Sequence, residues 1–524
     1  MAKQKSEKSI EESLWDSANK LRGTVESSEY KHVVLGLIFL KFVSDKFEAR
    51  KKEIIAEGKE KYVDMVEFYT MQNVFYLAPE SRWNYIMEHA KQDDIAIKID
   101  TALFTVEKNN PSLKGALPDN YFSRLNLDAS KLSALLDTVN NIDTISDNEE
   151  DVVGRVYEYF LGKFAATEGK GGGEFYTPKC VVKLLAEMIE PYKGKIYDPA
   201  CGSGGMFVQS IKFIESHNGS KKDISIYGQE YTATTYKLAK MNLAIRGISA
   251  NLGDVPADTF FKDQHPDLKA DFIMANPPFN QKGWRAENEL TDDPRWRGYD
   301  VPPTGNANYA WILNMISKLS ENGTAGFVLA NGSMSSNTSG EGELRQKFIE
   351  NDLVDCMIAL PGQLFYTTQI PVCLWFMTKN KSSTSSVQGM DNGFRDRQGE
   401  TLFIDARNMG TMLDRTHKEL TDDDIAKIAG TYHNWRSQVS DTEPVEGYED
   451  VAGYCKSATF EDIKKNDFVL TPGRYVGIAE EEDDGIPFEE KMTELSQTLF
   501  AQMSEASELD KTIRENLKVL GYDC

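Results

Sequence analysis

The sequence predicts an α/β protein whose core is a doubly wound, mostly parallel sheet, with helical segments before and after it. Apolar segments of strand length alternate with helical segments between residues 195 and 378, which is the pattern of such a sheet. Glycine-rich or polar turns follow several of these strands directly, and open α/β sheets bind ligands at that carboxyl edge. Before residue 165 and after residue 481, apolar residues recur at helical spacing instead.

These patterns divide the chain into three predicted domains: a helical domain over residues 1–165, an α/β domain over 166–480 and a terminal helix over 481–524 for subunit assembly. The longest apolar run, Val33 to Leu40, is far shorter than the roughly 20 residues of a membrane-spanning helix, and the polar amino terminus shows no signal peptide. Six cysteines and six histidines show no metal-ligand spacing. We therefore expect a cytoplasmic protein without membrane contact or metal.

The charge balance limits how this protein could bind nucleic acid. Its 59 Lys and Arg residues face 82 Asp and Glu residues, which gives a net charge of −23. A protein that binds duplex DNA alone normally carries a basic surface for the phosphates. Either nucleic acid is not the substrate, or a partner chain supplies most of the phosphate contacts.

The first predicted domain carries no motif with evident chemistry. The apolar residues around Val33 to Leu40 are dense enough for a helix buried on most sides, and further helices are expected near 132–139 and over 152–164. A structural or interaction role is the simplest interpretation of this domain.

The second domain opens with a glycine-rich segment, residues 169–173, whose backbone could approach a ligand. Six residues then precede an amphipathic helix over 181–189: Glu174, Phe175, Tyr176, Thr177, Pro178 and Lys179. Thr177 and Pro178 suit a helix N-cap and a first-turn proline. On its own, the segment is most simply interpreted as a linker before a helix.

The next strand, residues 195–198, ends in a tight glycine turn and a helix, the layout in which backbone N–H groups face a ligand. The turn contains Asp198, Ala200, Gly202, Ser203, Gly204 and Gly205. It is neither a Walker A loop nor G-x-G-x-x-G, and its acidic residue with Gly-x-Gly-Gly suits an amino-acid ammonium and carboxylate. Glu230 follows the second strand and is placed to accept both hydroxyls of a ribose. Asp254, in a later polar turn, could meet an adenine edge.

The apolar strand 270–275 stops at Asn276-Pro277-Pro278-Phe279, because two prolines remove two backbone donors. The amide oxygen of Asn276 and a backbone carbonyl fixed by the prolines could converge on one NH2 group. Phe279 would add a flat apolar face. This combination suits a planar amine such as a flipped nucleobase, although a strand followed by an ordinary Asn-Pro turn would look the same.

Alternation continues with strands at 324–330 and 354–360 and helices at 307–319 and 343–350. A last apolar strand, 371–378, follows a short connection and is expected to run antiparallel. Aromatic and arginine residues interleave in the loop 281–305, where Trp284, Arg285, Arg295 and Arg297 suit contacts with DNA. The alternative for this loop is ordinary packing, and we favour DNA contact.

The terminal helix has a narrow apolar seam at steps of three and four: Phe488, Met492, Leu495, Leu499, Met503, Ala506, Leu509, Ile513, Leu517 and Leu520. Such a seam is typical of coiled-coil pairing with another chain. Docking on its own domain is the alternative.

Together, the glycine turn and Asn276-Pro277-Pro278-Phe279 resemble the motifs of S-adenosylmethionine-dependent DNA adenine-N6 methyltransferases, and Phe175-Tyr176-Thr177-Pro178 is similar to their additional cofactor motif. More narrowly, the chain resembles the methylase (modification) subunits of type I restriction-modification systems. That likeness extends to residues 21–23, 29–31, 39–41, 306–311, 364–371 and 470–476. Cys201 is a departure from these motifs, because a residue such as alanine is more usual at its position. Cysteine is also a small residue.

The resemblance implies a seven-stranded methyltransferase sheet and S-adenosylmethionine as cofactor. Asn276 and the Pro277 carbonyl would accept the amino hydrogens of a flipped adenine, and Phe279 would stack on the base. Glu230 would bind the cofactor ribose and Asp254 its adenine, while residues 174–179 and 203–205 would wrap the remainder. Implied partners are double-stranded DNA, a specificity subunit that reads the sequence, a second copy of the chain and a restriction subunit.

Two alternatives stay open on the sequence. The same Asn-Pro-Pro-aromatic motif occurs in methyltransferases for other planar amines, such as a protein glutamine or an RNA base. The chain could also be a cofactor-binding scaffold without catalysis, although an intact Asn276 to Phe279 motif argues against that.

Overall fold

A computed structural model divides the chain into two compact units, residues 1–477 and 478–524. The structure describes residues 14–16, 19, 27–125, 127–142, 159–160, 177–365, 370–382, 394–414, 417–437, 447–478 and 488–519. Most of the predicted helix over 152–164 lies outside these residues, as do Glu174, Phe175 and Tyr176.

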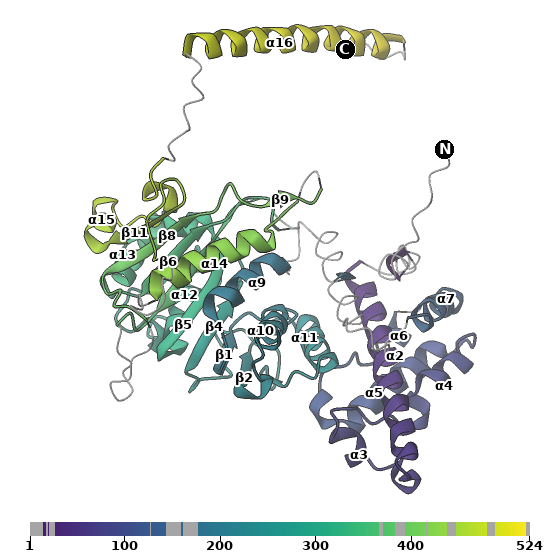
Figure 1. Ribbon diagram of the computed structural model, residues 1–524. Coiled ribbons are helices and arrows are strands. Elements are labelled where there is room, and N and C mark those ends of the chain that lie inside the picture. Colours follow the sequence, from purple (N-terminus) through teal and green to yellow (C-terminus); the bar gives the residue numbers. More distant parts are fainter. Residues whose placement is uncertain are drawn as a thin grey trace. The chain divides into compact units, whose positions relative to one another are not determined.

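The amino-terminal part of the first unit is helical (Figure 1). Its helices are α2 (Ser27–Ala56), α3 (Glu67–Thr70), α4 (Trp83–Glu88), α5 (Ile95–Asn109), α6 (Tyr121–Arg124) and α7 (Ala129–Asn140). In α2, every residue from Val33 to Leu40 other than Gly36 is at most 1% exposed. The prediction of a helix buried on most sides is therefore confirmed, and α3, α4 and α7 pack against α2.

A large sheet follows, and in the described part of the chain it has nine strands in the order β11-β8-β6-β7-β5-β4-β1-β2-β3. The strands are β1 (Gly194–Asp198), β2 (Ile224–Gly228), β3 (Ala250–Asn251), β4 (Ala270–Ala275), β5 (Leu319–Ala330), β6 (Val354–Ala359), β7 (Val372–Thr378), β8 (Glu400–Asp405) and β11 (Cys455–Thr459). A separate antiparallel pair joins β9 (Thr411–Met412) to β10 (Lys418–Glu419).

The predicted fold class is confirmed, because β1 to β5 pair in parallel and β7 runs antiparallel to both β5 and β6. The predicted number of seven strands is too low. Strand β8 pairs in parallel with β6, and β11 pairs antiparallel with β8, so two further strands extend that edge of the sheet.

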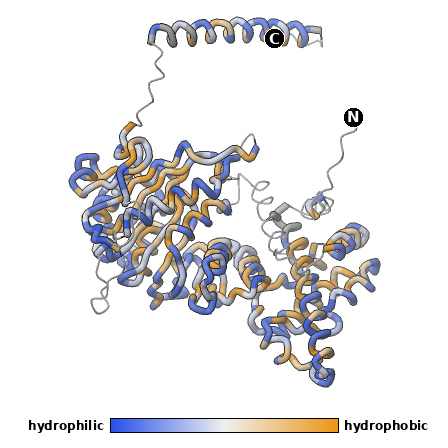
Figure 2. Tube along the Cα trace, viewed as in Figure 1, coloured by the Kyte–Doolittle hydropathy of each residue, from blue (hydrophilic) through white to orange (hydrophobic). Residues whose placement is uncertain are grey.

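Helices cover both faces of the sheet: α9 (Lys179–Ile189), α10 (Gly205–Ser216), α11 (Ala233–Ile245), α12 (Asn308–Lys318), α13 (Glu341–Glu350), α14 (Asp422–Arg436) and α15 (Phe460–Lys465). Alternate residues of a strand point to opposite faces. Accordingly, Ile273 and Ala275 belong to the core with α12 and α13, whereas Met274 belongs to the core with α9 and α14. Figure 2 shows the apolar strands between these layers.

Helix α11 belongs to two cores at once. Leu238 and Met241 pack in the core of the amino-terminal helices, whereas Tyr236 and Leu243 pack against the β1 and β2 side of the sheet. The Lys237 ammonium also donates to the carbonyl of Leu117, over 3.2 Å. This helix therefore joins the helical region to the sheet.

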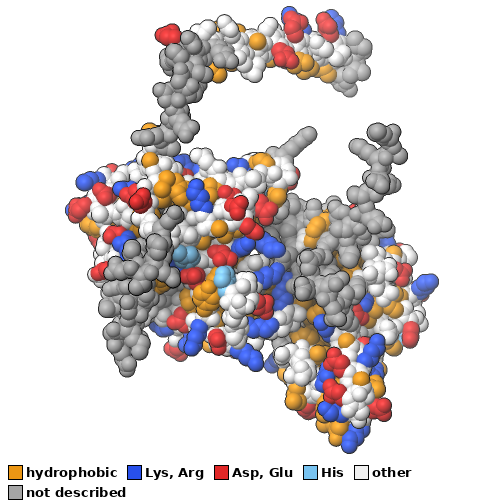
Figure 3. Space-filling view, in the orientation of Figure 1, with side chains coloured by type: hydrophobic (Ala, Val, Ile, Leu, Met, Phe, Trp, Pro, Cys, Tyr) orange, Lys and Arg blue, Asp and Glu red, His pale blue; other side chains and the backbone are white. Residues whose placement is uncertain are grey.

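Acidic and basic side chains are interspersed over the face of the molecule in Figure 3.

The second unit contains the helix α16 (Phe488–Val519), so the predicted terminal helix is present. Apolar side chains along it are 53% to 59% exposed: Met492, Leu495, Leu499, Met503, Leu509 and Ile513. Throughout the described residues, every helix is too short or too polar to cross a bilayer.

Candidate active site

The carboxyl end of β4 places Asn276 directly before Pro277, where the prolines end the strand. Asn276 is 9% exposed. Its Nδ2 donates to Oγ1 of Thr177 over 2.8 Å, whereas its Oδ1 is buried and accepts no hydrogen bond from any described residue. Buried amide oxygens are nearly always hydrogen-bonded, so this acceptor is available to a donor that the described part of the chain does not provide.

Phe279, two residues beyond Pro277, is half-buried at the same edge of the sheet. Its ring meets the ring of Phe365 at a centroid distance of 5.9 Å and an interplanar angle of 71°. This edge-to-face contact fixes the ring of Phe279. The ring of Phe279 and the amide of Asn276 thus lie in the short segment that follows β4.

Two asparagines hold the backbone that leaves this segment. Asn280 has a left-handed φ of 51°, which asparagine tolerates better than most residues. Its N–H donates to Oδ1 of Asn308 over 3.0 Å, and Nδ2 of Asn308 donates back to Oδ1 of Asn280 over 2.9 Å. Asn308 is buried in the first turn of α12, so this paired contact anchors the Asn276 segment to a helix.

The glycine turn lies between β1 and α10. Gly204 is the N-cap of α10 with a φ of 81°, and Gly202 has a φ of 53°, both in the left-handed region that favours glycine. A Cβ at Gly202 or Gly205 would meet no atom of the described residues within 4 Å. As far as these residues show, the backbone at the two glycines borders open space beside a helix N-terminus, which attracts negative charge.

Asp198, the last residue of β1, is 1% exposed. Its Oδ1 accepts the N–H of Ala200 over 2.9 Å. Burial raises the pKa of Asp198 to about 8, the Ala200 hydrogen bond lowers it in part, and the nearby Glu230 raises it further. Near neutral pH this carboxyl holds a proton, and a cation placed beside it would favour the ionised form.

Glu230 follows β2 and is half-buried. Its Oε2 accepts the N–H of Gly202 over 3.1 Å, and its Oε1 accepts the N–H of Thr232 over 2.8 Å. The next polar turn is held by Gln264, whose Oε1 accepts the N–H of Asp254 over 2.9 Å, while Asp254 itself is exposed. The three carboxylates predicted from the sequence thus lie on three turns at one edge of the sheet.

A model of the family described as N-6 DNA Methylase matches residues 148–484, and one described as HsdM N-terminal domain matches residues 10–139. The chain belongs to the N-6 DNA methylase family. The predicted enzyme class, an adenine-specific DNA methyltransferase, is thereby confirmed.

Named relatives of this methylase are methylase subunits. It is 51% identical over 440 residues to the type I restriction enzyme HindI methylase subunit of Haemophilus influenzae, covering 83% of this chain and 94% of that protein. It is 40% identical over 534 residues to the MjaIX methylase subunit of Methanocaldococcus jannaschii, covering 98% and 92%. The predicted resemblance to type I methylase subunits is therefore confirmed.

A solved structure supports the fold of the methylase independently. The methyltransferase subunit of a type I restriction-modification system from Streptococcus thermophilus aligns with a TM-score of 0.70 at 23% identity, over 89% of this chain and 99% of that one.

The loop after Phe279 uses three of its four predicted DNA-contact residues for its own packing. Trp284 is 5% exposed and donates to the carbonyl of Pro303 over 2.8 Å. Arg295 pairs with Asp293 and donates to the carbonyls of Thr259 and Phe260.

Arg285 donates to the carbonyl of Pro302 over 2.7 Å and to three carbonyls of its own turn. These contacts favour the packing interpretation for Trp284, Arg285 and Arg295, in place of the DNA contact that we favour from sequence. Arg297 is exposed and is the predicted residue of this set that suits a phosphate contact.

The structure corrects the local prediction at Thr177. Helix α9 begins at Lys179 with Pro178 as its N-cap, and its cap carries no side-chain hydrogen bond. The Thr177 hydroxyl instead reaches Asn276, as described above. Lys179 is exposed.

Several residues that shape this edge were not predicted from the sequence. Asn242, buried in α11, donates to the carbonyl of Ser203 over 2.7 Å and so supports the glycine turn. Gln264 holds the Asp254 turn. Asn242 stands among apolar residues of a predicted helix, and this position in the sequence could have indicated a structural role. An isolated glutamine in a loop, such as Gln264, gives no such indication. Tyr231, next to Glu230, is 72% exposed and is a further candidate for a ligand contact.

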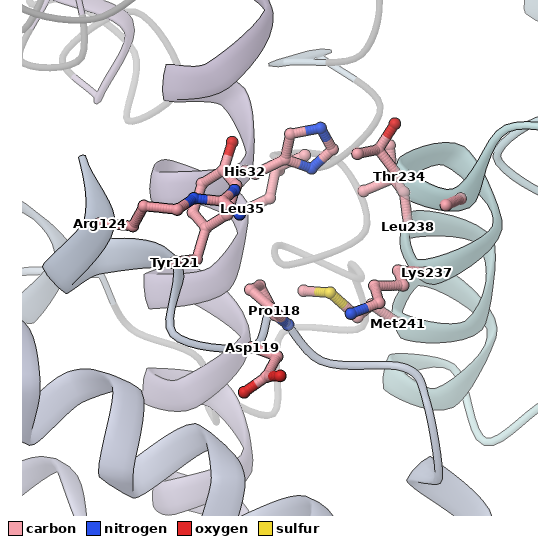
Figure 4. Close-up of a pocket in the computed structure, with 11 residues that line it drawn as sticks. His32, Leu35, Pro118, Asp119, Tyr121, Arg124, Thr234, Lys237, Leu238 and Met241 are labelled. Carbon is pink, nitrogen blue, oxygen red and sulfur yellow. The ribbon is translucent and has the colours of Figure 1, made fainter.

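A cavity of about 300 Å³ lies between the amino-terminal helices and α11 of the methylase (Figure 4). Leu35, Leu238 and Met241 give it apolar walls, and Asp119, Arg124 and Lys237 add charge. In Figure 4, Arg124 and Lys237 come from opposite sides of the cavity. The junction between the helical region and the sheet is therefore incompletely filled by protein.

Proposed function

We propose that this methylase transfers a methyl group from S-adenosylmethionine to N6 of an adenine flipped out of double-stranded DNA, with Asn276 at the reacting centre. The observation that carries this proposal is the buried Oδ1 of Asn276, which lacks a hydrogen-bond donor among the described residues. The exocyclic amino group of adenine is such a donor, and it becomes reachable only when the base leaves the stack.

The residues around the glycine turn fit S-adenosylmethionine. Among the described residues, no atom fills the space beside the backbone at Gly202 and Gly205, and the buried carboxyl of Asp198 suits the ammonium of the amino-acid part. Glu230 would accept from the ribose hydroxyls, and Asp254 would meet the cofactor's adenine. The bound cofactor supplies an electrophilic methyl group on a sulfonium. Residues 174–176, Pro178, Lys179 and Ser203 complete this proposed cofactor site.

Catalysis by the chain's own residues rests on positioning and electrostatics. Oδ1 of Asn276 and the carbonyl of Pro277 accept the two amino hydrogens of adenine, which raises electron density on N6. Pro278 keeps that carbonyl in place, and the ring of Phe279 stacks on the base. The amino group held in this way would receive the methyl group that the bound cofactor supplies, S-adenosylhomocysteine would be the leaving product, and the proton released from N6 would pass to solvent water.

Partner subunits follow from the charge and from α16. With a net charge of −23, the chain has too few basic side chains in excess to bind DNA phosphates alone. Its two named relatives are also both described as subunits. A specificity subunit would read the DNA sequence and supply most phosphate contacts, with the exposed apolar side of α16 as a docking site. A second copy of the chain and a restriction subunit would complete the assembly.

All cysteines among the described residues are buried free thiols, which fits a protein of the reducing cytoplasm.

Transfer of a tritiated methyl group from S-adenosylmethionine to DNA tests the proposal. Wild type and Asn276→Ala are compared, each with and without the specificity subunit. We expect label in N6-methyladenine only when the partner is present, and none with the variant. Label in protein or RNA, or transfer that survives Asn276→Ala, would overturn the proposal.

A further inference from the structure

The contact between Thr177 and Asn276 joins two segments 99 residues apart. Thr177 precedes the N-cap of α9, and α9 packs on the sheet beside β4 and β5. A residue before proline is restricted to extended backbone, and a β-branched side chain has few χ1 rotamers. The Thr177 hydroxyl is therefore held in place by its own chemistry and by its neighbour Pro178.

This contact leaves Oδ1 of the Asn276 amide facing the reacting centre, because the Thr177 hydroxyl, which can accept or donate, accepts here from Nδ2. The oxygen and nitrogen of an amide have nearly the same shape, and a rotation of 180° exchanges them. With Nδ2 bonded to Oγ1 of Thr177, Oδ1 is left buried and without a partner among the described residues. In the opposite orientation, the NH2 group would face the amino group of the substrate, and two donors would oppose one another.

We propose that Thr177 is a positioning residue for methyl transfer, whose hydroxyl oxygen holds Nδ2 of Asn276 so that Oδ1 accepts from the target amino group. The inference rests on the proposed function and deepens it. It differs from the cofactor-binding role that the sequence predicts for Thr177, because here the residue acts through Asn276. Loss of the hydroxyl lowers the rate of the chemical step and leaves cofactor affinity nearly unchanged.

Two variants separate the hydroxyl from the shape of the side chain. Thr177→Val keeps the shape and removes the oxygen, whereas Thr177→Ser keeps the oxygen. Both are measured in the complete methylase complex with its specificity subunit. The readouts are kcat for adenine methylation, Kd for S-adenosylmethionine by calorimetry and the midpoint of thermal unfolding.

We expect Thr177→Val to lower kcat by about ten- to a hundredfold, the scale of a misplaced catalytic group, with Kd for S-adenosylmethionine within about threefold of wild type. Thr177→Ser restores most of the rate. The double variant Thr177→Val with Asn276→Ala is no slower than Asn276→Ala alone, because Thr177 acts only through that amide.

Other results overturn the inference. An unchanged kcat in Thr177→Val does so, as does a loss confined to S-adenosylmethionine affinity or a double variant whose effects add. If Thr177→Val fails to fold, a wild-type rate in a folded Thr177→Ala variant overturns it and a slow one supports it. Failure of the proposed function is distinguishable, because wild type itself would then leave no methyl group on adenine N6.

Discussion

Gly202 donates its backbone N–H to Oε2 of Glu230 over 3.1 Å, although the two residues follow different strands. The strands β1 and β2 are parallel neighbours with Asp198 opposite Gly228, so the turns that follow them meet at one edge. The other carboxylate oxygen of Glu230 accepts from Thr232 at the N-cap of α11. A single side chain thus fixes both the glycine turn and the start of the next helix.

Replacement of Glu230 by alanine should weaken S-adenosylmethionine binding by more than about tenfold. The change removes the proposed ribose contact and leaves two backbone donors without their acceptor, each of which costs about 1–3 kcal/mol if it stays buried. Calorimetric titration of the purified chain measures the effect. Glu215→Ala, at the far end of α10, is the matched control and should bind normally. Equal affinity of Glu230→Ala and wild type would contradict the prediction.

Asp198→Asn should stabilise the ligand-free protein near neutral pH. The pKa of Asp198 is about 8 in the folded chain, against 3.8 for an ordinary aspartate. Because the folded pKa is raised, its contribution to stability is fully present below about pH 4 and is lost as the pH rises towards 8. Asparagine keeps the acceptor for Ala200 without ionising. Thermal unfolding across this range should show a gain for the variant that grows with pH, and a gain that is constant with pH would refute the assignment.

The same carboxyl predicts proton release on cofactor binding. An ammonium group placed beside Asp198 lowers its pKa, so S-adenosylmethionine should displace a proton at pH 7 and bind more tightly as the pH rises towards about 8. Calorimetry in buffers of different ionisation enthalpy counts that proton. Asp198→Asn should bind more weakly and release none. Equal proton release by both proteins would show that another group titrates.

The fold and the core of the site were predictable because they depend on local patterns. Apolar strands that end in Asp198 or lead directly to Glu230 and Asn276 are visible as such in the sequence, and the carboxyl ends of parallel strands meet at one edge. Strands β8 and β11 were missed because their pairing is set by β6 and by each other, far along the chain.

Side-chain roles were harder to predict, because partners distant in sequence decide them. Arg295 looks like a phosphate ligand, yet carbonyls 35 and 36 residues away satisfy it. Thr177 looks like an N-cap, yet its hydroxyl contacts the amide of Asn276, which directly follows β4. The assignments of individual cofactor and substrate residues, and the three domain boundaries, stay predictions.

Replacing Arg295 by alanine should lower folding stability, whereas replacing Arg297 by alanine should weaken DNA binding. Arg295→Ala leaves Asp293 nearly buried without its partner, which should cost about 3 kcal/mol of folding stability. Arg297→Ala should leave stability unchanged, weaken DNA binding by the complete complex and reduce the slope of log affinity against log salt by about 1. Fluorescence anisotropy over a salt series, with thermal unfolding beside it, separates the two effects. A salt slope unchanged by Arg297→Ala would exclude the phosphate contact.

The apolar side of α16 should be required for assembly and dispensable for the fold of the first unit. Leu495 and Leu509 are 58% and 56% exposed in this chain, so replacing both with glutamate buries no charge and should leave the thermal unfolding midpoint and S-adenosylmethionine affinity unchanged. A coiled-coil partner would have to bury those charges at high cost, and co-purification with the specificity subunit should be lost. Gln497→Glu, on the opposite side of the helix, should assemble normally. Intact assembly of the double glutamate variant would place the subunit contact elsewhere on the chain.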